Sequence, residues 1–153
     1  MGPFVRAILL VEDDANDARL LKRAFDKIGL EVPVVRVEHG DDAVAYLRGE
    51  NQYVDRALYP MPSIVLLDLK LPRRSGFEVL QWVRGTESEC RRLPIVVLSS
   101  SDEPSDINRS YEMGANSYLA KPHSTQEFVA LAEAFRDYWI DLNRDPQINQ
   151  LYC

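Results

Sequence analysis

The segment Ile64-Val65-Leu66-Leu67-Asp68 places a carboxylate directly after four consecutive aliphatic residues. A short, uninterrupted apolar run of this kind is typical of a strand in a parallel sheet whose two faces are both covered by helices. Other short, mainly apolar runs lie at residues 7–11, 34–37, 95–98 and 117–120. Stretches of helical periodicity separate these runs, so the sequence predicts one α/β domain.

Start and stop signals place several of the helices. Apolar residues between 20 and 28 recur at helical spacing and precede Gly29, which suits the residue after a helix end. Similar spacing predicts helices over 77–83 and from Pro104 onward. The segment Ser124-Thr125-Gln126-Glu127 predicts a capping box at the start of the last helix. The apolar stripe of that helix, which we expect to pack on the sheet, is Phe128, Leu131, Ala132, Phe135, Tyr138, Trp139 and Leu142.

Polar residues follow the predicted strands at the points where the strands end. Glu12-Asp13-Asp14 follows the first run, Asp68 the third, Ser99 the fourth and Lys121 the fifth. The carboxyl ends of parallel strands meet at one edge of the sheet, where such folds bind their ligands. Acids also favour the first turn of a helix, and that structural role suits Asp14 better than its two neighbours. We therefore expect carboxylates, a hydroxyl and an ammonium group to converge.

Composition excludes several classes of protein. With 46% hydrophobic and 27% charged residues, the 153-residue chain has the balance of a globular domain. A formal net charge of −6 disfavours a nucleic-acid-binding surface. The apolar run near the N-terminus is too short for a signal peptide or a membrane span, so we expect a cytoplasmic protein. Cys90 and Cys153 match no metal-binding or redox spacing, and we expect two free thiols.

Together, four motifs resemble the signature of response-regulator receiver domains. They are Glu12-Asp13, the segment from Asp68 to Gly76, Ser99, and Lys121-Pro122. The resemblance extends over about residues 6 to 144. It implies a flavodoxin-like, doubly wound parallel sheet of five strands in the order 2-1-3-4-5, with five helices. We accordingly expect a receiver domain over residues 1–144 and a C-terminal tail over residues 145–153.

The resemblance also implies roles for the acidic residues. Asp68 is expected to accept a phosphoryl group, and Mg²⁺ is the expected cofactor. Asp13 and Asp68 are the expected magnesium ligands, with Glu12 acting largely through metal-bound water and Lys70 through its backbone carbonyl. Clustered carboxylates repel one another, so a pocket of this kind favours a hard cation that takes oxygen ligands.

Three further residues complete the implied phosphorylation and switch machinery. Lys121 is expected to pair with a phosphoryl oxygen as a point charge. Ser99 is the expected switch hydroxyl, and Tyr118 is the aromatic residue expected to change rotamer with it. The implied function is that of a phosphoacceptor signalling protein rather than an enzyme, which assists its own phosphotransfer and dephosphorylation.

Two features resemble the single-domain regulators of bacterial phytochromes. The connection over residues 49–62 is unusually long, and we expect no effector domain after the domain that ends near residue 144. The expected partner is therefore a sensor histidine kinase, with a bacteriophytochrome as one candidate. We also expect a homodimer through the last strand and the two final helices, with an exposed apolar patch formed by Val129 and Ile140 and by Ile107 and Tyr111 on the helix before the last strand.

Three other functions would suit parts of this sequence. An aspartyl phosphohydrolase needs a second acid two positions after its nucleophile, where this chain has Lys70. An FMN-binding flavodoxin-like protein needs uncharged phosphate donors where residues 12–14 are acidic. A pseudo-receiver that only binds partners remains the main alternative, although the complete set of acidic, hydroxyl and lysine residues argues against it.

Overall fold

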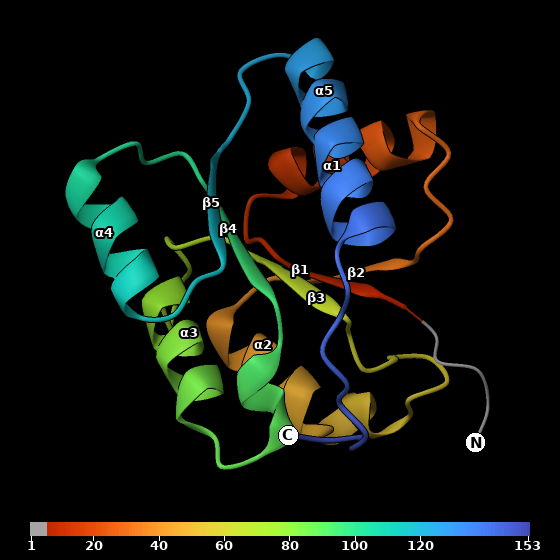
Figure 1. The fold of residues 1–153 in the computed structure, drawn as a ribbon, viewed down its shortest axis with the longest axis vertical. Coiled ribbons are helices and arrows are strands. Elements are labelled where there is room, and N and C mark those ends of the chain that lie inside the picture. Colours follow the sequence, from red (N-terminus) through yellow and green to blue (C-terminus); the bar gives the residue numbers. More distant parts are fainter. Residues whose placement is uncertain (1–5) are drawn as a thin grey trace.

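Five parallel strands form one sheet at the centre of the molecule (Figure 1). The computed structural model describes residues 6–153. Its strands run in the order β2-β1-β3-β4-β5, as the flavodoxin-like class predicts. Ile8 in β1 lies opposite both Val34 in β2 and Ile64 in β3. The strands are β1 (Ile8–Val11), β2 (Val34–Val37), β3 (Ile64–Leu67), β4 (Ile95–Ser99) and β5 (Ser117–Ala120).

Helices cover both faces of this sheet. Figure 1 shows α1 and α5 side by side on one face, with α2 and α3 on the other. Within residues 6–153, no helix combines the length and apolar character that crossing a membrane requires. The helices are α1 (Ala15–Lys27), α2 (Gly40–Arg48), α3 (Gly76–Gly85), α4 (Pro104–Glu112) and α5 (Thr125–Phe135). Short 3-10 helices η1 (Asn51–Val54) and η2 (Glu89–Arg92) and the π-helical η3 (Arg136–Leu142) complete the set.

Alternate strand residues feed two separate hydrophobic cores. Leu9 and Leu67 belong to the core under α2 and α3. Ile8 and Leu66 belong to the core under α1 and α5. Successive side chains on a strand point to opposite faces, so a sheet covered on both sides needs apolar residues at every position. This explains why β1 and β3 read as unbroken apolar runs.

The predicted helix caps are present, with one difference in the capping box. Asp14 caps α1, because its carboxylate accepts a hydrogen bond from the Asp17 amide at 2.9 Å. At the start of α5, the Ser124 hydroxyl accepts from the Glu127 amide at 3.1 Å. The Glu127 carboxylate accepts from the amide of His123 at 2.9 Å, one residue earlier than the reciprocal bond of a capping box. The hydrogen-bonded ring at the start of α5 therefore includes one more residue than a standard capping box.

The exposed apolar surface of α5 and η3 differs from the one predicted. Tyr138 and Leu142, assigned to the buried stripe, are 52% and 71% exposed. Val129 and Ile140, assigned to the exposed patch, are half-buried and pack against the core under α1 and α5. The π-helical geometry of η3 shifts the register relative to an ideal α-helix, which explains the exchange for residues beyond Phe135.

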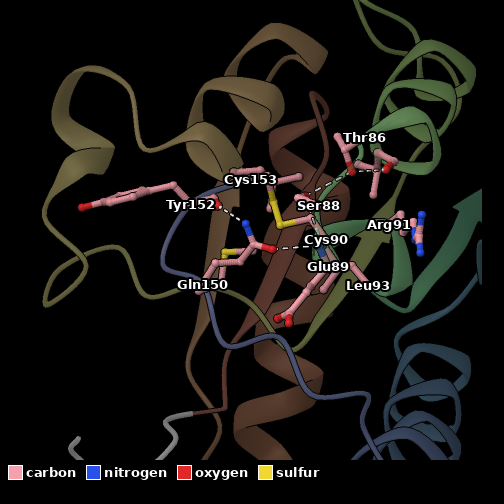
Figure 2. Close-up of a disulfide and its surroundings, with 12 residues drawn as sticks. Thr86, Ser88, Glu89, Cys90, Arg91, Leu93, Gln150, Tyr152 and Cys153 are labelled. Carbon is pink, nitrogen blue, oxygen red and sulfur yellow. Dashed lines mark hydrogen bonds between the residues drawn. A yellow bond between two sulfur atoms is a disulfide. The ribbon is translucent and has the colours of Figure 1, made fainter.

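The prediction of two free thiols was wrong, because Cys90 and Cys153 form a disulfide with a Cα–Cα distance of 5.6 Å (Figure 2). The C-terminal segment, residues 143–153, leaves η3 and runs back along the molecule towards α2 and η1 (Figure 1). Its Ile148 is buried in the core under α2 and α3. The two cysteines are 63 residues apart, so only this return path brings them together.

The long connection at residues 49–62 is ordered around aromatic side chains. Tyr46 stacks with Tyr53 and Tyr59, at ring-centroid distances of 5.0 and 6.1 Å. The Tyr46 hydroxyl donates to the carbonyl of Pro60 at 2.7 Å. Burial raises the pKa of this phenol to about 12. The connection thus packs as a small layer beneath α2 rather than extending into solvent.

Candidate functional site

Three carboxylates gather where β1 and β3 end. Glu12 and Asp13 follow β1, and Asp68 follows the neighbouring β3. Each offers one oxygen, and the three oxygens lie within 4.8 Å of one another. Glu12 and Asp68 are buried, at 3% and 6% exposure, whereas Asp13 faces solvent. The adjacent register of the two strands therefore brings together the acids that the sequence predicted at this edge.

A glycine allows the chain to pass close to this cluster. A Cβ atom on Gly76, the first residue of α3, would lie 2.2 Å from the backbone oxygen of Asp68. Such a distance is far below any normal contact, so only glycine fits there without a shift of backbone. The same turn places the amide of Lys70 3.4 Å from the Asp68 carboxylate, and the Lys70 side chain is exposed.

Lys121, directly after β5, extends its ammonium group into the acidic cluster. Its Nζ lies 2.6 Å from the Glu12 carboxylate and 3.1 Å from that of Asp68. A third carboxylate, from Asp17 in the first turn of α1, lies 3.0 Å from the same atom. The ammonium offers three donors, and each has an acidic partner here. Lys121 thus contacts three carboxyl groups, and with Asp13 the site holds four acidic side chains for one ammonium, which leaves it negatively charged.

The electrostatics follow from burial and from this unequal charge. Burial raises the pKa of Glu12 to about 8, and nearby Asp68 adds to the rise while Lys121 opposes it. Burial alone would lower the pKa of Lys121, but its hydrogen bond to Glu12 and the charges of Asp68 and Glu12 outweigh that effect and raise it. Lys121 therefore remains a cation at neutral pH, while Glu12 holds its proton more tightly than an exposed glutamate.

Asp17 was not among the predicted site residues. An acid in the first turn of a helix is common because it favours the positive end of the helix dipole. Asp17 therefore gives no direct sign in the sequence of a second, functional role. The available signal was its helical position, one turn after Asp13 on the same helix start. Its contact with Lys121 spans 104 positions, so the sequence alone cannot reveal it.

Ser99 and Tyr118 lie beside this cluster. Ser99 is the last residue of β4, and Tyr118 is in the neighbouring β5. Ser99 is fully buried, and its hydroxyl accepts a hydrogen bond from the Ser101 amide at 3.2 Å. The Tyr118 hydroxyl donates to the Ser101 carbonyl at 2.6 Å. The backbone of Lys121 joins the same group, because its amide donates to the Ser99 carbonyl at 2.8 Å. Ser101 therefore links both predicted switch residues.

The donor set at this edge suits a hard divalent cation. Carboxylate oxygens are the ligands that Mg²⁺ prefers, and the ion usually keeps several waters in addition to one or two protein carboxylates. Solvent-facing Asp13 provides an open side for those waters, and buried Asp68 and Glu12 provide the inner side. A bound cation would supply positive charge beside the Asp68 carboxylate.

Comparison with known proteins gives the same picture. The family described as "Response regulator receiver domain" matches residues 8–133. The methanogenesis regulatory protein FilR2 of Methanothrix harundinacea, named as probable, is 39% identical over 94% of this chain and 88% of its own. Response regulator Rcp1 of Synechocystis is 30% identical over 89% of this chain and 90% of its own.

Solved structures extend the likeness to the fold. The Mn(2+)-bound form of Rcp1 superposes with a TM-score of 0.82 and covers 93% of this chain and 99% of its own, at 30% identity. The phosphorylated cyanobacterial phytochrome response regulator RcpA gives a TM-score of 0.84 with the same two coverages, at 33% identity. The residues matched by the family, 8–133, include all five strands and the acidic residues Glu12, Asp13 and Asp68. The chain belongs to the response regulator receiver domain family.

Proposed function

We propose that this protein accepts a phosphoryl group on Asp68 from a histidine kinase, in a magnesium-dependent reaction, and signals as a single-domain response regulator. The observation that carries the proposal is the convergence of Asp68, Asp13 and Glu12 with the Lys121 ammonium at one sheet edge. Glu12, Asp13, Asp68 and the backbone carbonyl of Lys70 would hold the cation. Residues 1–144 form the receiver domain in this proposal, with 145–153 as its tail.

The chemistry follows from the positions of the side chains. A carboxylate oxygen of Asp68 forms the new bond to phosphorus, while the bond between phosphorus and the donor breaks and the donor keeps that electron pair. Charge on the transferred group is the main obstacle in phosphoryl transfer, so a nearby point charge stabilises it. Lys121, 3.1 Å from Asp68, is placed to provide that charge. Ser99 and Tyr118 would then respond to the new oxygens.

The proposed setting is a cytoplasmic two-component pathway. Likeness to RcpA, a cyanobacterial phytochrome response regulator, makes a bacterial phytochrome kinase the first candidate donor. The negative net charge disfavours direct action on nucleic acid, so the output is proposed to be a protein surface.

Self-association is proposed through β5, α5 and η3. A hollow of about 460 Å³ on this face is lined by Leu119, Leu131 and Tyr138, among others. Tyr138 and the neighbouring Leu142 are large apolar side chains left open to solvent. A twofold pairing would bury this surface against its own copy. Ser99 and Tyr118, in adjacent strands, offer a route by which phosphorylation would alter its strength.

The test is to incubate the protein with acetyl phosphate, with and without Mg²⁺, and to measure the intact mass. The expected result is one added phosphoryl group in Mg²⁺, none with a chelator, and none in Asp68→Asn. The exposed Asp26 on α1 has no side-chain partner in residues 6–153, so Asp26→Asn is the matched control and should be modified like the wild type.

Two outcomes would count against the proposal. An adduct of equal yield in Asp68→Asn would place the phosphoryl group on another residue. A wild-type protein that binds Mg²⁺ but gains no mass would instead be a pseudo-receiver. Flavin absorbance in the purified protein would favour the FMN-binding alternative.

A further inference from the structure

Polar contacts fasten the C-terminal segment to two separate elements near the disulfide (Figure 2). The Glu89 amide in η2 donates to the Gln150 side-chain oxygen at 2.7 Å, and the Glu89 carboxylate accepts from the Asn149 amide at 2.6 Å. On the other side, the Cys153 amide donates to the carbonyl of Leu47 in α2 at 2.8 Å. The segment therefore bridges α2 and η2, which are not neighbours in sequence.

The long connection forms the rest of the docking surface. Arg56 donates to the Leu151 carbonyl at 2.8 Å, and its guanidinium lies 4.8 Å from the centre of the Tyr152 ring. The Tyr152 hydroxyl donates to the Val54 carbonyl at 2.9 Å. A Cβ atom on Gly49 would come within 2.0 Å of the Tyr152 ring, so glycine at this left-handed position also makes room for it.

The two sulfur atoms lie in unequal surroundings. Cys90 is fully buried in the core under α2 and α3. Cys153 is only half-buried, and Leu151 two residues earlier is 60% exposed. Of the two cysteine residues, only Cys153 thus has surface open to solvent, which makes it the side from which we expect a reductant to attack. Disulfides that are strained or exposed are the labile and regulatory ones, whereas buried structural bridges resist reduction.

We propose that the Cys90–Cys153 disulfide is a reversible redox latch, which a dithiol reductant opens to release residues 149–153 from α2 and η2. The proposal is independent of phosphoryl transfer. The disulfide lies towards the edge where the parallel strands begin, because Cys90 is in η2 just before β4 and the Cys153 amide bonds to Leu47 near the end of α2, which precedes β3. Asp68 follows β3 and lies at the opposite edge.

The exchange balances as an ordinary thiol–disulfide reaction. A thiolate of the dithiol bonds to the Cys153 sulfur, the bond between Cys153 and Cys90 breaks, and Cys90 leaves with the electron pair and takes a proton. The second thiol of the reductant then attacks the mixed disulfide, forming the reductant's own disulfide and releasing Cys153 as a thiol. The protein gains two electrons and two protons, and the dithiol loses them.

Once the bond is open, the remaining contacts are mostly exposed hydrogen bonds. Such bonds each contribute little net stability, because water replaces them when they break. Ile148, which stays buried, marks the point up to which the segment remains docked. Release of the residues beyond it would uncover Arg56 and the aromatic layer beneath α2 as a new surface.

The test compares amide hydrogen exchange in the oxidised protein and in protein reduced with dithiothreitol. The amides of Asn149 and Cys153 are the reporters, because both donate to groups outside the segment. After reduction we expect them to exchange roughly tenfold faster or more, as expected for a locally opened segment. The amide of Leu66 in β3 should keep its rate. Reoxidation should restore protection of the reporters.

Variants and a parallel readout make the outcome decisive. Cys153→Ser should show fast exchange without reductant and no response to dithiothreitol, and Cys90→Ala repeats the test from the buried side. If Cys90→Ala fails to fold, Cys153→Ser still decides the matter. Two unmodified thiols after mild oxidation, or reporters equally protected in both redox states, would overturn the latch. The phosphoryl adduct on Asp68, measured on the same samples, should be unaffected and is tested separately.

Discussion

Raising the pH from 6 to 9 is expected to strengthen Mg²⁺ binding by about a hundredfold. Burial among carboxylates raises the pKa of Glu12 to about 8. Metal ligands must be deprotonated, so below pH 8 each unit of pH lowers the apparent affinity about tenfold. Lys121 stays cationic over this range, because its pKa is raised, and so it adds no pH dependence of its own.

Calorimetry measures this effect in two independent ways. Apparent affinity is obtained from titrations at each pH. Proton release is obtained at pH 7 from buffers with different ionisation enthalpies, and about 0.9 proton per bound ion is expected if Glu12 ionises on binding. Glu12→Gln keeps the size of the side chain but cannot ionise. Its Mg²⁺ affinity should be weaker than that of the wild type at pH 9 and nearly constant with pH.

The same shift predicts the stability of the metal-free protein. The pKa of Glu12 is about 8 in the folded state and near its ordinary value of 4.5 when unfolded, so the folded state binds the proton more tightly. The stabilisation from this group is therefore complete below about pH 4.5 and is lost as the pH rises through about 8.

A wild-type Mg²⁺ affinity that changes less than about threefold between pH 6 and 9 would refute the assignment of Glu12 as the titrating ligand.

Three further predictions concern other parts of the molecule. Asp17→Asn removes a negative charge beside the site and should weaken Mg²⁺ binding roughly two- to fivefold in titrations, whereas Asp26→Asn should not. Arg84→Ala removes four hydrogen bonds between α3 and the loops around β4, and should lower the unfolding free energy by about 3 kcal/mol in urea denaturation. Sedimentation of both phosphorylation states should show dimers that Tyr138→Glu weakens more than Ile140→Glu does. A protein that is monomeric in both states would refute self-association through β5, α5 and η3.

The order and type of the structural elements could be read from the sequence. Unbroken apolar runs such as Ile64–Leu67 are typical of a strand that is covered on both faces, and such cover is supplied by helices that connect parallel strands. Asp68, Ser99 and Lys121 each follow one of those runs. Their meeting at one edge of the sheet could therefore be predicted, since parallel strands end at the same edge. Local chemistry likewise placed Asp14 at the start of a helix and Gly29 after a helix end, although the role of Asp14 as the cap came only from the structure.

Contacts between distant segments that do not meet at strand ends were beyond the sequence. The spacing of Cys90 and Cys153 carries no information about pairing, because the partner is chosen by where the C-terminal segment docks. Asp17 looks like any acid in a first helical turn until α1 is packed beside Lys121. The exposed face of η3 depends on its π-helical geometry, which no residue in the segment predicts. Apolar periodicity and the residues that follow a strand depend only on neighbouring positions, so they can be read directly from the sequence. Pairing, charge partners and exposure depend on which surfaces meet, and only the folded chain decides that.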